Sequence, residues 1–472
     1  MKIRYTIAVL AIVLMTTAAT AAGPPAKSTA DDQTGMEVTV YNSNIGLIKD
    51  TRNIVLPKGQ GELRFMDVAA SIKPVTVLVK AANAPETFSI LEQNYEYDLM
   101  NASKLLDKYV GKKIKIIDWN KYQDRTETVE AILLSNNQDQ ILKIGNEIYL
   151  GYPGVKVLPE LPENLIAKPT LTWLYENERA GPLALEVSYL TDNITWKADY
   201  VMVLNAKDTS SDLAGWVTVD NRSGGAYRDA TLKLVAGEFH RVEDRYREKM
   251  FAMEDKARVG AAQFVEKEFF EYHIYDLARK TTLKDMQTKQ VTLLEAPGVG
   301  VRKEYRVYGS SSFFTQRLQD ETPKQPVKVM ILFRNAADNG LGMPLPAGII
   351  RLYKEDESGS RQFAGEDEIA HTPKNEEVAL TIGEAFDIAA ERIQTNFVQI
   401  TTRRYESEWE ITLRNHKKEA VTVAVIEPLW GSWNIMRSSH PYKKLDAFTV
   451  RFDVKVPVDG ETKVTYKVSV GL

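Results

Sequence analysis

The chain of 472 residues contains no cysteine. It therefore has no disulfide framework, no thiolate metal site and no cysteine nucleophile. Histidine is also scarce, and its five copies are dispersed along the sequence. The formal net charge of −4 lacks the basic excess that is typical of nucleic-acid-binding proteins, so we expect no nucleic-acid partner.

The sequence also lacks the short motifs of common catalytic and nucleotide-binding sites. It contains no H-E-x-x-H, no G-x-S-x-G, no P-loop and no G-x-G-x-x-G. We therefore predict no catalytic residue, no cofactor-binding residue and no cofactor. A glycosidase needs only two carboxylates about 5–10 Å apart. With 64 acidic residues the sequence does not single out such a pair, so a hydrolase stays an alternative.

The one conspicuous apolar run lies at the start of the chain. Lys2 and Arg4 precede the apolar residues Ile7–Met15, and Ala19–Ala21 has the small side chains of a cleavage site. The run is too short to cross a hydrocarbon core of about 30 Å. Residues 1–21 are therefore predicted to be a signal peptide, and we expect an exported chain in the periplasm or at the cell surface, with no membrane span after cleavage.

The next two segments differ in composition. Residues 22–35 contain two adjacent prolines and small polar residues, which predict a flexible leader. Residues 36–100 alternate between apolar and polar side chains, for instance at Glu37–Tyr41, and Pro57–Gly61 is a turn between two such runs. This pattern predicts a small N-terminal β unit.

Residues 101–160 predict a short helix followed by a small sheet. Asn101–Val110 places Leu105, Leu106 and Tyr109 on one face. Three strands with tight turns follow, which together indicate an SH3-like barrel. Barrels of this kind often bind peptides, but we favour a packing module between neighbouring parts of the chain, because fold does not determine function.

The remaining chain predicts two β-sandwich modules, at residues 165–326 and 327–472. Residues 241–258 break the first module with helical spacing and charges of both signs, which predicts an amphipathic helical insert. Near the end, Phe448–Val456 and Val464–Val470 alternate strictly and predict a hairpin. The predicted fold is thus mainly β, with β-sandwich modules preceded by a small β unit and an SH3-like barrel, and with one or two inserted helices.

Several stretches resemble one bacterial family. Leu185–Leu204 reads LEVSYLTDNITWKADYVMVL and Gly224–Gly237 reads GGAYRDATLKLVAG. These stretches, with FEYHIYDLARKTTLKDMQTKQVTLL and LPAGIIRLYKEDESGSRQFAGEDEIAHTP, are similar to the C-terminal region of mucoidy inhibitor A-like proteins, known as domain of unknown function 4139. The resemblance covers roughly Leu171–Leu472, and the N-terminal segments differ from the family's usual N-terminal domain and coiled coil. It implies an exported or envelope-linked β-sandwich protein and transfers no catalytic residue.

One segment of the sequence combines several acidic residues with a histidine. A hairpin is predicted around Ile349–Tyr353, and an acidic loop with one histidine, Gly365–His371, follows it. Glu366, Glu368 and His371 are candidate ligands for a hard or borderline cation, with Asp367 pointing elsewhere if the segment is extended. The structural interpretation is favoured over the metal site: the carboxylates stabilise a turn, and His371 hydrogen-bonds to the backbone.

Two classes of function therefore remain. The favoured one is an exported, non-enzymatic β-sandwich protein that binds or supports an envelope protein or glycan. The alternative is a hydrolase of envelope carbohydrate or peptide that uses paired carboxylates. A flat, exposed apolar patch would favour binding, whereas a deep cleft with facing carboxylates would favour hydrolysis.

Overall fold

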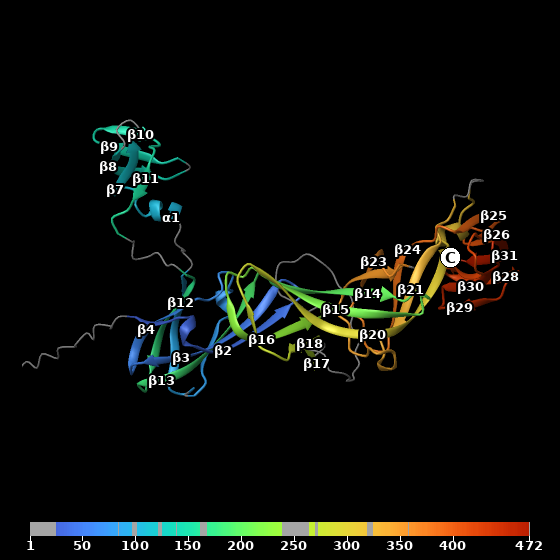
Figure 1. Cartoon of the computed structure of the whole chain (residues 1–472), viewed down its shortest axis with the longest axis horizontal. Coiled ribbons are helices and arrows are strands. Elements are labelled where there is room, and N and C mark those ends of the chain that lie inside the picture. Colours follow the sequence, from blue (N-terminus) through green and yellow to red (C-terminus); the bar gives the residue numbers. More distant parts are fainter. Residues whose placement is uncertain are drawn as a thin grey trace, which may run out of the picture. The chain divides into compact units, whose positions relative to one another are not determined.

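The computed structural model describes residues 25–83, 85–96, 102–120, 125–137, 139–160, 168–237, 264–269, 272–318, 324–356 and 358–471. Within these residues the chain is mainly β, as predicted, and it divides into two units (Figure 1). The first comprises Met1–Glu37, Leu47–Asp192 and Ser223–Arg228, and the second comprises Val38–Gly46, Asn193–Arg222 and Asp229–Leu472. The predicted signal peptide, residues 1–21, and the predicted helical insert, residues 241–258, lie outside the described residues.

The first unit contains a four-stranded sheet in the order β1-β4-β12-β6. Its strands are β1 (Ala26–Ser28), β4 (Gly59–Met66), β12 (Thr170–Asn177) and β6 (Phe88–Glu96). The unit also contains β5 (Leu78–Ala81), which pairs with β13 (Gly181–Asp192), and most of β3 (Ile45–Leu56). Strands β2 (Gln33–Tyr41) and β16 (Tyr227–Ala236) contribute residues to both units.

The prediction of a flexible leader at residues 22–35 is wrong from Ala26 onward. Strand β1 pairs in parallel with β4, and a short 3-10 helix, Ala30–Asp32, follows it. Thr29 caps this helix, with its hydroxyl oxygen accepting from the Asp31 N–H and its own N–H donating to Asp32. Ser28 is fully buried. The small polar residues therefore form the hydrogen bonds of a turn, whereas the prediction assigned them to a flexible, solvent-exposed segment.

The N-terminal β unit predicted at residues 36–100 is not a separate module. Strands β4 and β6 both pair with β12, and Trp173 of β12 lies between Leu63 and Gln93. Trp173 is fully buried, with its ring 5.3 Å from that of Phe65. A period-two pattern shows which face of a strand is buried. It does not identify the distant strand with which that strand pairs.

Residues 102–157 form the predicted helix and small sheet. Helix α1 (Ala102–Asp107) precedes a five-stranded sheet in the order β10-β9-β8-β7-β11. The strands are β7 (Lys113–Asn120), β8 (Arg125–Ser135), β9 (Ile141–Ile144), β10 (Glu147–Leu150) and β11 (Val155–Val157). Leu106 and Tyr109 pack on the sheet's own small core. The prediction of a barrel is wrong, because β10 and β11 are the two ends of the strand order and the sheet is not closed.

The second unit is built around a ten-stranded sheet. Its main path is β23-β22-β14-β15-β20-β27-β30-β29, and β21 pairs with both β20 and β24. The strands are β14 (Ile194–Leu204), β15 (Ser210–Asn221), β20 (Gln287–Tyr308), β21 (Lys328–Arg334), β22 (Gly348–Glu355), β23 (Arg361–Ile369), β24 (Glu377–Glu384), β27 (Val421–Pro428), β29 (Tyr442–Lys444) and β30 (Thr449–Val456).

A four-stranded sheet in the order β25-β26-β31-β28 completes the C-terminal part of this unit. Its strands are β25 (Ile388–Thr401), β26 (Arg404–Asn415), β28 (Ser432–Ser438) and β31 (Gly460–Gly471). Strands β17 (Phe264–Phe269), β18 (Tyr272–Leu277) and β19 (Thr281–Leu283) lie earlier in the unit, and β18 pairs with β17 and with β16.

The predicted division between two sandwiches at residues 326 and 327 does not match the sheets. The 22-residue strand β20 pairs with β15 through its first half and with β21 and β27 through its second half. Phe314, from the 3-10 helix Ser311–Phe314, is also buried in the C-terminal core. One long strand therefore joins the two predicted modules.

A C-terminal sandwich is nevertheless present, and it corrects the predicted hairpin. Alternate residues of β30 and β31 are buried in one core, as the pattern indicates. However, β30 pairs with β27 and β29, whereas β31 pairs with β26 and β28. The turn between them carries the chain from one sheet of the sandwich to the other. Among the described residues no helix is long and apolar enough to cross a membrane.

Candidate functional site

The predicted hairpin around Ile349–Tyr353 is present, but the acidic segment after it is not a loop. Strands β22 and β23 pair antiparallel, and Glu366 and Glu368 lie within β23. Glu366 is paired with Arg351 on the neighbouring strand, with Nε and Oε2 3.3 Å apart. A cross-strand partner of opposite charge stabilises such a carboxylate in a strand, so an acidic run does not require a loop.

Two of the three candidate metal ligands, Glu366 and His371, have separate partners. His371 Nδ1 accepts the Ala347 N–H at 3.1 Å, and its Nε2 lies 3.4 Å from Asn42 Nδ2. Asp367 points to the other side of β23, where its carboxylate accepts the Thr381 N–H at 2.6 Å. In the described ranges no group of three or more His, Asp or Glu side chains is arranged to hold a metal ion.

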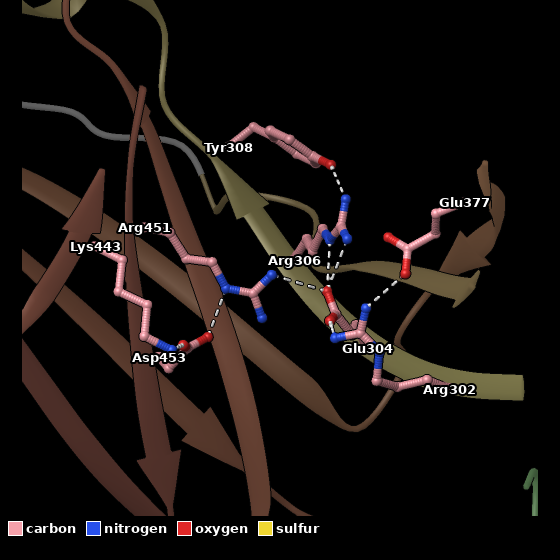
Figure 2. Close-up of polar contacts among 8 residues, drawn as sticks. All are labelled: Arg302, Glu304, Arg306, Tyr308, Glu377, Lys443, Arg451 and Asp453. Carbon is pink, nitrogen blue, oxygen red and sulfur yellow. Dashed lines mark hydrogen bonds and ion pairs between the residues drawn. The ribbon is translucent and has the colours of Figure 1, made fainter. Parts of the chain in front are cut away.

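A dense polar network lies on β20 and β30 (Figure 2). Glu304, which is 8% exposed, accepts from Arg302, Arg306 and Arg451. Asp453 is paired with Arg451 at 2.6 Å and with Lys443 at 3.2 Å. Strand β27 lies between β20 and β30, where its small Ala424 is opposite both Arg306 and Asp453.

This network has a structural role, because its ion pairs connect neighbouring strands. Burial alone would raise the pKa of Glu304, but hydrogen bonds and charges from Arg451 and Arg306 outweigh burial and hold the pKa below its ordinary value. Each of the three arginines has at least one carboxylate partner (Figure 2). The network therefore joins β20 to β30 and leaves little positive charge for a ligand.

The best candidate for a binding site is a group of two exposed aromatic residues and one partly buried tryptophan at one end of the C-terminal sandwich. We name Trp430, Trp433 and Phe448 the aromatic platform. Trp430 and Phe448 stack with their ring centroids 5.9 Å apart and their planes 17° apart, and they are 59% and 47% exposed. Leu445 beside them is also exposed. Exposed aromatic groups of this kind mark interaction surfaces more often than structural ones.

The platform is held by two loops that bond to each other. The Leu429 N–H donates to the Phe448 carbonyl at 2.5 Å, and Trp433 Nε1–H donates to the Ala447 carbonyl at 2.8 Å. The Phe448 N–H donates to the Asp446 carboxylate. Leu429 itself is fully buried beneath the platform. The rings are therefore presented on a fixed backbone, which lowers the entropy lost when a ligand binds.

Two basic residues, Lys444 and Arg404, lie at this end of the sandwich together with the acidic Asp446. Lys444 Nζ lies 4.3 Å from the centroid of the Trp433 ring. Arg404, at the turn between β25 and β26, is in register with Gly471, which is in turn in register with Ser432, two residues from Trp430. In the part of the chain that the structure describes, neither Arg404 nor Lys444 forms an ion pair with a carboxylate, whereas the neighbouring Lys443 is paired with Asp453. An anionic group is therefore complementary to this end of the sandwich.

The hydrolase alternative requires a cleft with facing carboxylates. A cleft of about 450 Å³ on the four-stranded sheet contains Glu408 and Glu410. Glu408 is paired with Arg437 at 2.6 Å, and Glu410 is paired with Lys463 at 2.8 Å. Both carboxylates project from one strand, two residues apart, and are already neutralised by cations. This arrangement differs from the facing acid and base of a glycosidase.

Sequence reasoning does not identify the platform. Trp430 and Trp433 follow Pro428 in a stretch without period two, and the alternating pattern assigns Phe448 to the last strand pair. The available signal is the Leu-Trp-Gly-Ser-Trp sequence at 429–433, where two tryptophans flank a glycine that has φ 68°. Tryptophans beside a turn have less opportunity to be buried than tryptophans in the middle of a strand.

Comparison with protein-family models and with curated proteins finds no match for this chain.

Proposed function

We propose that this chain is an exported, non-enzymatic β-sandwich protein of the bacterial envelope, and that the aromatic platform binds an acidic polysaccharide. The observation that carries the proposal is the stacked, half-exposed Trp430–Phe448 pair, with Lys444 over the Trp433 ring and Arg404 two strands away from Ser432. The apolar face of a sugar ring stacks on an aromatic ring, and a uronic acid carboxylate pairs with arginine or lysine. The envelope location is part of the proposal and follows from the sequence resemblance to domain of unknown function 4139, although no family model matches the chain.

The charge and shape of the surface favour a glycan over the other partners. The platform combines stacked aromatic rings with a lysine over the Trp433 ring, which suits a chain of charged sugar rings. The cleft with Glu408 and Glu410 does not favour hydrolysis, because both carboxylates are held in ion pairs. Binding is therefore the function that the site supports best.

The test uses oligogalacturonide as an acidic probe and a neutral galacto-oligosaccharide of equal length, with binding measured by calorimetry. We expect the acidic probe to bind more tightly, and Trp430→Ala to weaken its binding about ten-fold, which is about 1.4 kcal/mol. Arg404→Gln should weaken binding of the acidic probe and leave binding of the neutral probe unchanged, and added salt should have the same two effects.

Trp216→Ala is the matched control, because Trp216 is 38% exposed but lies on β15. It should bind the acidic probe like the wild type. Equal losses in Trp216→Ala and Trp430→Ala, or equal affinity for the two probes, would contradict the proposal. Release of new reducing ends from either probe would favour the hydrolase instead.

A further inference from the structure

Another cavity in the second unit of the chain has apolar walls and a charged entrance. This cavity of about 220 Å³ lies among strands β14, β20, β21, β22 and β24, and we name it the Asp208 pocket. Its apolar wall residues are Leu204, Val329, Ile331, Leu352 and Ile382. Leu204, Ile331 and Leu352 are almost fully buried.

Strand pairing explains why these side chains face one another. Lys303 is directly opposite Ile331 in the β20–β21 pair, so both project from the same face. Leu204 is in register with Lys354 in the β14–β22 pair. Each of these two pairs thus contributes one apolar wall residue and one lysine to the pocket.

The back of the pocket is formed by a close approach of two strands. Gly365 of β23 has φ 149°, and a Cβ at this position would lie 2.3 Å from the Ile382 carbonyl oxygen of β24. Only glycine allows β23 to pass this close to β24. The β22–β23 register also shifts here, between Leu352 and Tyr353, and Ala364 lies on the rim.

One carboxylate links the two lysines at the entrance. Asp208 accepts from Lys303 at 2.8 Å and from Lys354 at 2.5 Å. Its turn is fixed, because the Asn205 side chain accepts the Thr209 N–H at 3.0 Å and the Thr209 carbonyl accepts the Val301 N–H at 3.0 Å. Burial alone would raise the pKa of Asp208, but its hydrogen bonds to the lysines outweigh burial and lower the pKa.

The entrance retains a net positive charge. Two ammonium groups face one ionised carboxylate, and the nearby Glu384 is already paired with Lys328 at 2.9 Å. An ammonium group has three N–H donors, and the structure shows Lys354 donating to Asp208 alone among the described residues. Lys354 therefore has donors left for a second anionic acceptor.

We propose that the Asp208 pocket binds a small amphipathic carboxylate, with its aliphatic tail among the apolar wall residues and its carboxylate on Lys354 and Lys303. The volume is below that of pockets for drug-sized ligands, which sets the tail at about six to eight carbons. The pocket shares no residue with the aromatic platform, so this inference does not depend on the proposed glycan binding.

The test titrates the full chain with octanoate, with neutral 1-octanol and with cationic octylamine, and follows binding by calorimetry. Octanoate should bind saturably at one site per chain, and both comparison compounds should bind at least about ten-fold more weakly. Lys354→Met should weaken octanoate binding about ten-fold. Lys197→Met is the matched control, because Lys197 is an exposed lysine with a single Asp199 partner, and it should bind octanoate like the wild type.

A second variant tests the location independently of charge. Ala364→Phe adds a ring to the pocket lining at a position where alanine is exposed, so we expect the larger side chain to be accommodated. It should block octanoate binding while its circular dichroism and melting temperature stay those of the wild type. Absence of saturable octanoate binding, equal binding of octylamine, or unchanged binding in both Lys354→Met and Ala364→Phe would overturn the proposal.

Discussion

At the scale of single residues, the C-terminal core contains a charge pair that ordinary sandwich cores lack. Arg392 and Glu427 are 1% and 0% exposed, and their Nη1 and Oε1 atoms are 2.6 Å apart. The guanidinium lies 5.5 Å from the Phe313 ring centroid and 5.7 Å from that of Trp409. Burial raises the pKa of Glu427, although the charge of Arg392 opposes this. Neither charge is stable here without the other.

Removing one member of this pair should therefore lower the free energy of unfolding far more than removing both members. Arg392→Met leaves a buried carboxylate without its cation and should lower the free energy of unfolding by about 3–5 kcal/mol. The double variant Arg392→Met with Glu427→Leu should recover much of that loss. Urea unfolding measures both values. Arg414→Met, at a partly exposed pair with Glu391, is the control and should lower the free energy of unfolding much less. A double variant no more stable than Arg392→Met would contradict this account.

Glu304 makes the fold sensitive to acid. Its pKa is lower in the folded chain than in the unfolded chain, because Arg451 and Arg306 hold the ionised form against the opposing effect of burial. Its stabilising contribution is therefore complete above the unfolded pKa of about 4.3 and is lost as pH falls through the folded pKa. We expect Glu304→Gln to lose about 2 kcal/mol at pH 7 and much less at pH 3.

The measurement is urea unfolding at both pH values. Glu391→Gln, at a pair on the outside of the sandwich, is the control and should change stability little at either pH. A Glu304→Gln loss of the same size at pH 3 and pH 7 would show that packing, not charge, explains the effect.

His371 tests whether the acidic segment has a structural role. His371→Ala removes the acceptor of the Ala347 N–H and should lower the free energy of unfolding by about 1 kcal/mol. Added calcium or zinc should leave the melting temperature of the wild type unchanged. His416→Ala is the control, because His416 is also exposed but its ring lies 3.9 Å from Asp459, beyond hydrogen-bond distance, and it should have a smaller effect. A metal-dependent rise in melting temperature that His371→Ala abolishes would restore the metal hypothesis.

At the scale of elements, the sequence predicted which segments are strands better than it predicted how they pair. The alternating pattern identified the buried face of β30 and β31 correctly, since a period of two depends only on local geometry. Pairing depends on distant strands, so the predicted hairpin and the closed barrel were both wrong. The acidic residues of β23 were assigned to a loop for a related reason: Arg351, the partner of Glu366, lies on another strand.

The absence of cysteine allows a direct test of the β30–β31 assignment. Thr422 and Lys455 are directly opposite in the β27–β30 pair, and both are exposed. Thr422→Cys with Lys455→Cys should form a disulfide on oxidation, because opposite Cβ atoms lie about 4.5–5.5 Å apart. A simple hairpin would instead place Lys455 opposite Lys463, which the structure puts on a different sheet.

The control variant is therefore Lys455→Cys with Lys463→Cys, which should stay reduced. Non-reducing electrophoresis and thiol counting distinguish the two results. Disulfide formation in the control, without formation in the Thr422→Cys and Lys455→Cys variant, would support the simple hairpin.

At the scale of the whole molecule, the sequence predicted the fold class but not its division. Strands β4 and β6 of the predicted N-terminal unit pair with β12, and β20 pairs with strands on both sides of the predicted boundary at 326 and 327. Domain boundaries are usually sought where composition changes, and here prolines and polar residues lie in loops between strands of the same unit. A chain of interleaved sheets gives no local signal of where one unit ends.

The final prediction concerns export of the whole chain. Lys2, Arg4 and the short apolar run before Ala21 have the order of a secretory signal peptide. We expect the exported chain to begin near Ala22, which would leave β1 intact because it begins at Ala26. Cleavage would remove two positive charges and no acidic residue, so the net charge would change from −4 to about −6.

Intact-mass measurement on protein from the envelope fraction checks the start site. Ala19→Arg with Ala21→Arg is the control, because large charged residues block cleavage, and it should keep the full mass. Wild-type protein that retains Met1 in that fraction would refute the prediction.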